Sequence, residues 1–407
     1  MAKQKKQFMS MSQATQLMPQ EELLMIKKDS SRFSIGVPKE IAFQEKRVAI
    51  VPSAVSLLVE NGFEISVEKD AGVNASFSNE QYADAGAILV DSSEEIFQCD
   101  VILKVAPATM DEIAMMKNRI IIISALHERV QSKDYYRSLM QKGITALSYE
   151  HIRNNTNEHP ILHSISEIVG STSILLASSY LADSKWGRGK MLGGFIGINP
   201  SEVVILGAGV VAESAAKTAL GLGALVKMFD NSITDLRRLQ SNVGASLYSS
   251  IVQPNVLKNA LKTADVVIGA IYLKDGNSAP VVTEEMVEGM KEGSVIIDVS
   301  IDKGGCVETS RVTNHDKPVF KKHGVTHYCV PNISSRTPHT SSYALSNYFA
   351  PFLIRMFDEG GLNQLIINDE RIRAGAYIYN GKLTFRNIAE QYGMHFQDLN
   401  LMLAAFR

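Results

Sequence analysis

Short apolar runs alternate with helix-type patterns from Phe33 to about residue 300. Each run is long enough for one buried strand, and several of the segments between them carry helix start and stop signals. This alternation predicts an α/β fold with mostly parallel sheets and helices on both faces of each sheet. The runs lie at 34–37, 64–68, 87–90, 101–105, 120–124, 144–149, 203–206, 266–271 and 294–299.

Two longer helical patterns, at about 161–185 and 341–359, bracket the later strands. Because 407 residues exceed what one hydrophobic core organises, two domains are expected. We predict two Rossmann-like domains that are separated by a cleft and linked by the long helices. The predicted division is an N-terminal extension at 1–32, a discontinuous first domain at 33–160 plus 339–407, and a second domain at 161–338.

A glycine-rich turn follows the strand at Val203–Leu206 and opens a helix. Gly207 permits the tight turn, Gly209 lets a pyrophosphate approach the backbone, and Ala212 is small enough for close helix–strand packing. The next apolar run ends at Asp230, 23 residues after Gly207, where an acid can bind a ribose 2′-hydroxyl. The ordered set predicts a dinucleotide site, although the same turn also occurs in α/β proteins that bind no nucleotide.

The acid at Asp230 favours NAD over NADP, because a carboxylate repels a 2′-phosphate. The residues at 231–233 carry no positive charge, and Arg237 and Arg238 come later, on the predicted next helix. We therefore expect NAD as the cofactor.

Charge and cysteine usage exclude some classes of partner. A net charge of −2 gives no electrostatic reason to expect nucleic acid or an anionic membrane surface. The chain has no run of about 18 apolar residues, so no membrane span is predicted. The cysteines Cys99, Cys306 and Cys329 are too widely spaced for a zinc motif or a disulfide framework. We expect no metal and a reduced, cytoplasmic location.

The first 32 residues are polar and lack the continuous apolar stretch of a secretory signal. They are compatible with an amphipathic helix around Glu21–Lys28 or with a surface extension.

Four charged or titratable groups stand at the ends or starts of apolar runs, where open α/β sheets gather their chemistry. They are Arg47, Lys104, His127 and Asp302. Each also has a structural interpretation, as a solvated cation, an edge-strand lysine, a core histidine or a turn cap. Together with a hydride carrier they form a coherent set, in which two cations hold a small-molecule carboxylate and His127 and Asp302 move protons.

The chain resembles the alanine dehydrogenase family, which shares its fold with the NAD-binding part of proton-translocating transhydrogenase. The resemblance covers about residues 34–400 and rests on many motifs in the same order. They are GVPKE at 36–40, RVAIVP at 47–52, LKV at 103–105, LH at 126–127, YE at 149–150, SE at 166–167, VVILGAG at 203–209 and DVSIDKGGC at 298–306, followed by YCVPN and TSSYALSN.

This resemblance implies reversible, NAD-dependent oxidation of L-alanine to pyruvate and ammonia by a homo-oligomer, a hexamer in the family. It implies that Arg47 and Lys104 bind the substrate and that His127 and Asp302 are the proton donors and acceptors. The NAD contacts that the resemblance and the glycine turn together imply are Ser166, Gly207, Ala208, Gly209, Asp230, Ser249, Arg311 and Asn332.

The sequence departs from the family pattern beside these motifs. Ala106-Pro107-Ala108 replaces a charged KEP segment, Ile165 and Ile333 replace methionines, and Asp235 stands where a basic residue is usual. Two alternatives therefore stay open. One is a dehydrogenase of another small amino or oxo acid, and the other is a non-catalytic NAD-binding protein on the same scaffold.

Overall fold

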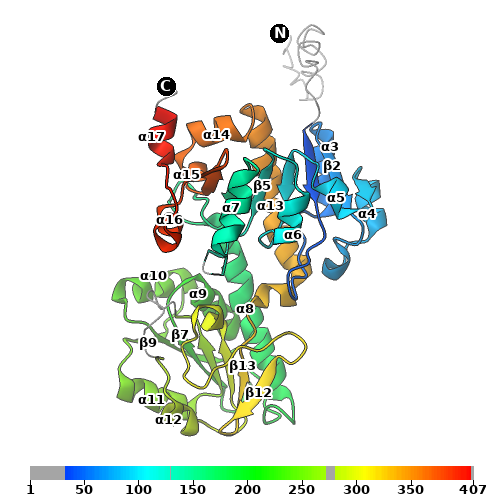
Figure 1. Cartoon of the computed structure of the whole chain (residues 1–407). Helices are drawn as coiled ribbons and strands as arrows, with labels where there is room; N and C mark the ends of the chain where they lie inside the picture. The colour runs from blue at the N-terminus through cyan, green and yellow to red at the C-terminus, as the bar shows by residue number, and fades with distance from the viewer. Residues whose placement is uncertain (1–32, 129, 272–279, 405–407) are drawn as a thin grey trace, which may run out of the picture.

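The computed structural model describes residues 33–404 except 129 and 272–279. The N-terminal extension at 1–32, with the helix expected around Glu21–Lys28, lies outside the described residues. Within them the chain forms two mixed sheets, each mostly parallel, as the alternating pattern predicts. Long helices join the two sheets (Figure 1).

The first sheet has eight strands in the order β15-β14-β6-β5-β4-β1-β2-β3. Its six N-terminal strands pair in parallel, and each lies within or on an apolar run of the sequence. They are β1 (Ser34–Val37), β2 (Glu64–Glu68), β3 (Ile88–Val90), β4 (Val101–Leu103), β5 (Ile121–Ser124) and β6 (Thr145–Ser148). The helices between them are α3 (Pro52–Glu60), α4 (Asn79–Asp84), α5 (Ser93–Ile96), α6 (Met110–Met115) and α7 (Lys133–Gln141), with a 3₁₀ turn η2 (Val73–Ala75).

The second sheet has seven strands in the order β12-β13-β11-β10-β7-β8-β9. Only β12 runs antiparallel to its neighbour. The strands are β7 (Glu202–Leu206), β8 (Leu225–Phe229), β9 (Tyr248–Ser250), β10 (Val266–Gly269), β11 (Val295–Asp298), β12 (Val319–Lys322) and β13 (Val325–Tyr328). The helices are α9 (Val210–Gly221), α10 (Ile233–Val243), α11 (Pro254–Thr263) and α12 (Glu284–Glu288), with 3₁₀ turns η3 (Val299–Lys303) and η4 (Ile333–Arg336).

The two long helices occur where the sequence places them, as α8 (Pro160–Ala182) and α13 (Pro338–Asp358). Gly170 of α8 lets the backbone of α9 come close, because a Cβ at this position would collide with the Val211 carbonyl oxygen. By length and apolar composition, α8 is also the one helix among the described residues that could cross a membrane. A buried core helix meets the same criterion, and α8 packs along α9.

After α13 the chain returns to the first sheet. It passes through α14 (Leu362–Asn368) and α15 (Glu370–Arg373) into β14 (Ala376–Tyr379), which pairs antiparallel with β6. Asn380 and Gly381, the turn expected from the sequence, both have positive φ and lead into β15 (Lys382–Leu383). The chain then forms α16 (Arg386–Tyr392) and α17 (Leu399–Ala404). We retain the discontinuous first domain, 33–160 with 339–407, as a proposal.

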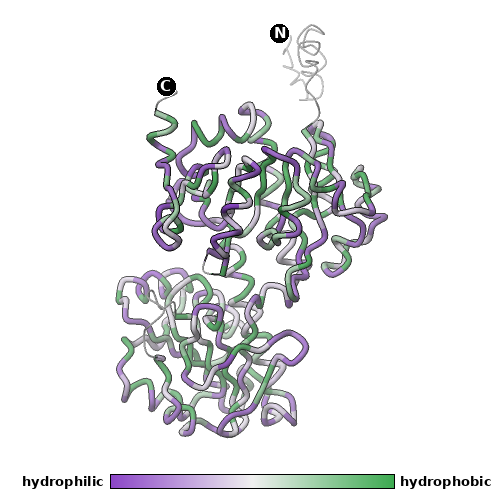
Figure 2. Tube along the Cα trace, in the orientation of Figure 1, coloured by the Kyte–Doolittle hydropathy of each residue, from purple (hydrophilic) through white to green (hydrophobic). Residues whose placement is uncertain are grey.

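Buried apolar residues form two core clusters around each sheet. In Figure 2 the hydrophobic colour is concentrated within each half of the molecule, and the hydrophilic colour is frequent on its outer segments. Strands buried on both faces read as continuous apolar runs, which is why the sequence reveals them. In such a sheet, polar side chains become accessible to a ligand mainly at the ends of the strands.

Candidate active site

Four adjacent parallel strands of the first sheet, in the order β6-β5-β4-β1, end at one edge. Because parallel strands share the direction of their carboxyl ends, the segments that follow them meet there. Arg47 follows β1, Lys104 follows β4 and His127 follows β5. Three of the residues predicted to carry the chemistry therefore belong to one edge.

Arg47 is buried and makes a two-pronged ion pair with Glu45. Nε donates to Oε1 at 2.7 Å and Nη2 to Oε2 at 2.6 Å. Ser335 and Asn332 also donate to Glu45, at 2.7 and 3.0 Å, so η4 and the residue that precedes it hold this pair. Burial opposes ionisation of Glu45, but Arg47 outweighs it and lowers the pKa of Glu45 to about 2. The pair therefore stays charged.

Lys104 is only 1% exposed and lies between two carboxylates. Its Nζ is 2.7 Å from Glu112 Oε1 and 3.3 Å from Glu40 Oε2. Burial lowers the pKa of Lys104, but the charges of Glu40 and Glu112 raise it above its ordinary value. Burial also raises the pKa of Glu40, and Lys104 only partly opposes that rise. This lysine is therefore a buried cation with two anionic partners, and the edge-strand interpretation is wrong.

The same edge is held together by side chains that bond the neighbouring backbone. Glu40, after β1, accepts the N–H of Val105 at 2.5 Å. The hydroxyl of Tyr149, after β6, donates to the carbonyl of Val105 at 2.8 Å. The segment after Lys104 is thus fixed from both sides.

His127 stands apart from these buried groups, because its side chain is 51% exposed. It is therefore not a core histidine. Its Nε2 lies 3.9 Å from Glu150 Oε1. Asp302, in η3 of the second sheet, is partly desolvated, which raises its pKa. Lys303 and His127 act on Asp302 in the opposite direction, so the acid–base candidates of the two sheets lie within electrostatic range of each other.

The glycine turn of the second sheet has the geometry that a dinucleotide needs. Gly207 has φ +110°, and a Cβ there would collide with the Ala270 carbonyl oxygen. Gly209 caps α9 without a side-chain bond, and the space where its Cβ would lie is open. Ala212 is fully buried against the sheet. The first N–H groups of α9 are therefore available to a pyrophosphate.

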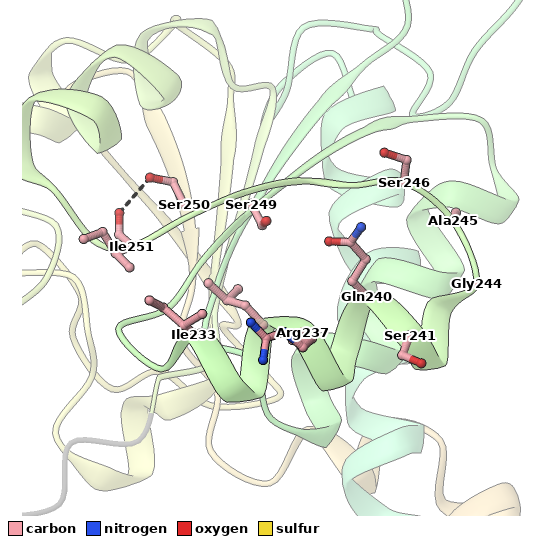
Figure 3. A pocket seen from close by; sticks show the side chains of 11 residues that line it. Ile233, Arg237, Gln240, Ser241, Gly244, Ala245, Ser246, Ser249, Ser250 and Ile251 are labelled. Atoms are coloured by element: carbon pink, nitrogen blue, oxygen red, sulfur yellow. Dashed lines mark hydrogen bonds between the residues drawn. The ribbon is translucent and has the colours of Figure 1, made fainter.

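Asp230 directly follows β8 and accepts the N–H of Ser232 at 2.7 Å. Nearby, an open hollow of about 810 Å³ lies between α10 and the segment from Gly244 to Ile251. Ser249 lines it opposite Arg237 and Gln240 (Figure 3). This hollow is large enough for the adenosine end of a dinucleotide.

Asp235, the acid at a usually basic position, pairs with Arg238 at 2.9 Å. Arg238 in turn donates to the carbonyl of Ala208 at 3.1 Å, so it braces the glycine turn. Among the remaining predicted contacts, Asn332 joins Arg47 through Glu45, whereas Ser166 lies on α8 and the exposed Arg311 stacks on Phe320 at 4.3 Å. In the described part of the chain no hydrogen bond or ion pair links Ser166 or Arg311 to the other candidates.

Comparison with known proteins agrees with this geometry. Residues 36–169 match the family model described as alanine dehydrogenase/PNT, N-terminal domain, and residues 173–386 match its C-terminal domain. The chain belongs to the alanine dehydrogenase/PNT family.

The alanine dehydrogenase of Bacillus subtilis is 36% identical over 89% of this chain and 95% of its own length. That of Methanococcus maripaludis is 36% identical over 88% and 96%. A solved L-alanine dehydrogenase superposes with a TM-score of 0.82 at 34% identity, covering 88% of this chain and 99% of that one. A transhydrogenase from Sinorhizobium meliloti shares the fold, with a TM-score of 0.73 at 23% identity.

Sequence analysis missed the carboxylates that partner the predicted groups in this family member. Glu40 is the last residue of the GVPKE motif and Glu150 is the last residue of the YE motif, so the motifs drew attention to both. Their hydrogen-bond partners follow neighbouring strands, and only the strand pairing reveals them. Glu112 was hidden by a second role, because its other oxygen caps α6 by accepting the N–H of Thr109. Glu45 is two residues from Arg47, and this short spacing could have predicted the ion pair between them.

Proposed function

We propose that this chain is an NAD-dependent dehydrogenase that converts L-alanine and water to pyruvate and ammonia, reversibly. The family and the names of its relatives support the reaction. The observation that carries it is the gathering of Arg47, Lys104 and His127 at the carboxyl edge of the first sheet, while Asp302 follows β11 of the second sheet. The oxidation of an amino acid needs acid–base groups beside the hydride carrier, because protons move as the hydride leaves. His127 and Asp302 are the candidates for this role.

NAD, when bound, supplies the hydride acceptor. Arg47 and Lys104 bind the substrate carboxylate, so that its Cα–H points toward the second sheet. Arg47 uses Nε and Nη2 on Glu45, and within the described residues its Nη1 has no protein partner. Lys104 likewise has one N–H beyond those that contact Glu40 and Glu112. Orientation of this kind can lower the activation barrier by several kcal/mol, and by about 7–11 kcal/mol for well-oriented groups.

His127 takes the proton that the ammonium group must lose before its nitrogen can form a C=N bond. Asp302 positions the water that adds to the resulting imine, and His127 returns its proton as ammonia departs. The reverse sequence aminates pyruvate. Both groups reach solvent, so their protons exchange with water between turnovers.

The cofactor choice follows from Asp230, since its carboxylate would repel the 2′-phosphate of NADP. We also propose Ser166, Ser249, Arg311 and Asn332 as NAD contacts, a homo-oligomer as the working assembly, and a cytoplasmic location. The buried free thiols of Cys99, Cys306 and Cys329 fit a reducing compartment. Light scattering that reports a 44.6 kDa monomer at micromolar concentration would contradict the assembly.

The test is consumption of NADH in the presence of pyruvate and ammonium. We expect turnover that depends on both, because reduction without ammonium would indicate a hydroxy-acid dehydrogenase instead. Glyoxylate and 2-oxobutyrate in place of pyruvate measure substrate choice. Binding of NAD without turnover of any of these acids would reject the enzymatic proposal.

A further inference from the structure

One carboxylate holds the turn that carries His127. Glu150 follows β6, and β6 pairs in parallel with β5, so the ends of the two strands are neighbours. Oε2 of Glu150 accepts the N–H of Leu126 at 2.7 Å and the N–H of His127 at 3.1 Å. Its other oxygen faces the imidazole, at 3.9 Å from Nε2. The backbone and the ring of His127 therefore both face the same carboxylate.

The backbone at His127 requires such support. Its φ is +48°, in the left-handed region that residues with a Cβ rarely adopt. Leu126 is fully buried, whereas the next side chain is half exposed, so the chain leaves the core at this peptide. Two successive N–H groups that converge on one anion stabilise this kind of turn. Within the described residues Glu150 is the acceptor that these two N–H groups have.

We infer that Glu150 is a positioning residue that fixes the turn at Leu126–His127 and thereby sets the place of the imidazole at the carboxyl edge of the first sheet. The inference rests on the proposed function, because it assigns no new chemistry and only explains how His127 is held. A general acid or base must stay within hydrogen-bond reach of the atom it serves. A turn free to relax out of the left-handed region would carry the imidazole away from that place.

The chain contains a second histidine–glutamate pair among its described residues, His323 with Glu284, in which the carboxylate contacts the ring and not the backbone. His323 also has a left-handed backbone, with φ +51°, and its Nε2 lies 2.7 Å from Glu284 Oε1. This pair stands at the amino end of β13, on the opposite edge of the second sheet from Asp302, which follows β11. Glu284 contacts the ring of His323, and in the part of the chain that the structure describes its carboxylate makes no hydrogen bond to that backbone. The variant Glu284→Gln is therefore the control for loss of a carboxylate beside a histidine.

The experiment compares Glu150→Ala, Glu150→Gln and Glu150→Asp with Glu284→Gln and the unchanged chain. The amide oxygen of Gln can accept the same two N–H groups, whereas Asp keeps the charge but is one methylene too short to reach both. We expect the Ala variant to lose about 10²-fold in kcat, the low end of the range for a disturbed acid–base group. The Gln variant should recover to within about tenfold of the unchanged chain, the Asp variant should recover less, and Glu284→Gln should have no effect.

The measurements are kcat and KM for reductive amination, NADH affinity by fluorescence and the fraction folded by thermal melting. NADH affinity should stay constant throughout, since the contacts of Glu150 among the described residues are with Leu126 and His127 of the first sheet. If Glu150→Ala does not fold, the order of the Gln and Asp variants decides. A kcat per folded molecule that is unchanged in these variants, or Asp equal to or better than Gln, would overturn the inference. An unchanged chain that consumes no NADH would instead reject the proposed function.

Discussion

The carboxyl edges of the two sheets are built on different physical principles. At the edge of the eight-stranded sheet, charged side chains hold one another, Arg47 with Glu45 and Lys104 with two carboxylates, nearly out of contact with water. At the edge of the seven-stranded sheet the backbone provides the binding surface, through Gly207 and the open first turn of α9. At the first edge most of the charge is balanced by neighbouring side chains, whereas at the second edge the backbone N–H groups of α9 have no side-chain cap.

This difference separates the effects of mutation. A buried ion pair that loses one member leaves a charge without compensation, so substitution at the first edge should change stability and activity together. At the second edge the side chains are partly solvated, and the groups that would bind the cofactor are mainly backbone N–H groups of the first turn of α9. Substitution there should change mainly the affinity for the cofactor.

The largest effect is expected from Lys104→Met, which leaves Glu40 and Glu112 buried without their cation. We expect a loss of about 3–5 kcal/mol in the free energy of unfolding, measured with urea, together with loss of turnover. Lys104→Met combined with Glu112→Gln should regain part of the stability but none of the activity. Full activity per folded molecule in the single variant would remove Lys104 from the substrate site.

His127→Ala should separate chemistry from stability on the same edge. The side chain is half exposed, so its loss should leave the melting temperature nearly unchanged. The value of kcat should fall by about 10²–10⁴. A variant that melts lower but turns over normally would show a structural histidine instead.

The ion pair of Glu45 predicts how stability responds to acid. The pKa of Glu45 is lowered from 4.5 to about 2 in the folded chain, so its contribution is present in full above pH 4.5 and is lost as pH falls from there through 2. The urea midpoints of the unchanged chain and of Glu45→Gln should therefore differ most at neutral pH and converge below pH 4.5. A difference that grows in acid would have the wrong sign for this pair.

Substitution of Asp230 should give the smallest effect, and that effect should be confined to cofactor binding at the edge of the seven-stranded sheet. NAD should bind at least about tenfold more tightly than NADP, since a lost charged hydrogen bond costs roughly 1.5–3 kcal/mol. Asp230→Ala should narrow that ratio and leave the melting temperature unchanged. Titration of both cofactors by fluorescence measures it, and equal affinities in the unchanged chain would exclude Asp230 from cofactor selection.

Local pattern predicted most of the fold. Strands buried on both faces of a sheet are continuous apolar runs, and the helices α8 and α13 were visible as long helical patterns. The glycine turn could also be predicted from the sequence. Gly207 adopts a positive φ, and a glycine directly after a strand indicates such a turn. Arg47, Lys104 and His127 could be proposed because polar groups at strand ends interrupt an apolar pattern.

The partners of those groups could not be predicted, because they come from other strands. Glu150 follows β6 and holds the turn after β5, while Glu40 follows β1 and holds the segment after β4. The order of strands in a sheet is a property of the folded chain, and sequence separation does not reveal it. The return of β14 to pair with β6 is a further case, in which more than 200 residues intervene.

The sequence by itself determined which segments form strands and helices, where a dinucleotide can approach the backbone, and which side chains are chemically able to act. Each of these depends on short-range sterics or on the identity of a single residue. The tertiary structure alone decided that the cations are already paired, that the side chain of His127 is exposed, and that Glu150 accepts the N–H groups of the turn that carries it. Those properties depend on burial and on distances of a few ångströms, since the strength of a charge interaction is set by its surroundings.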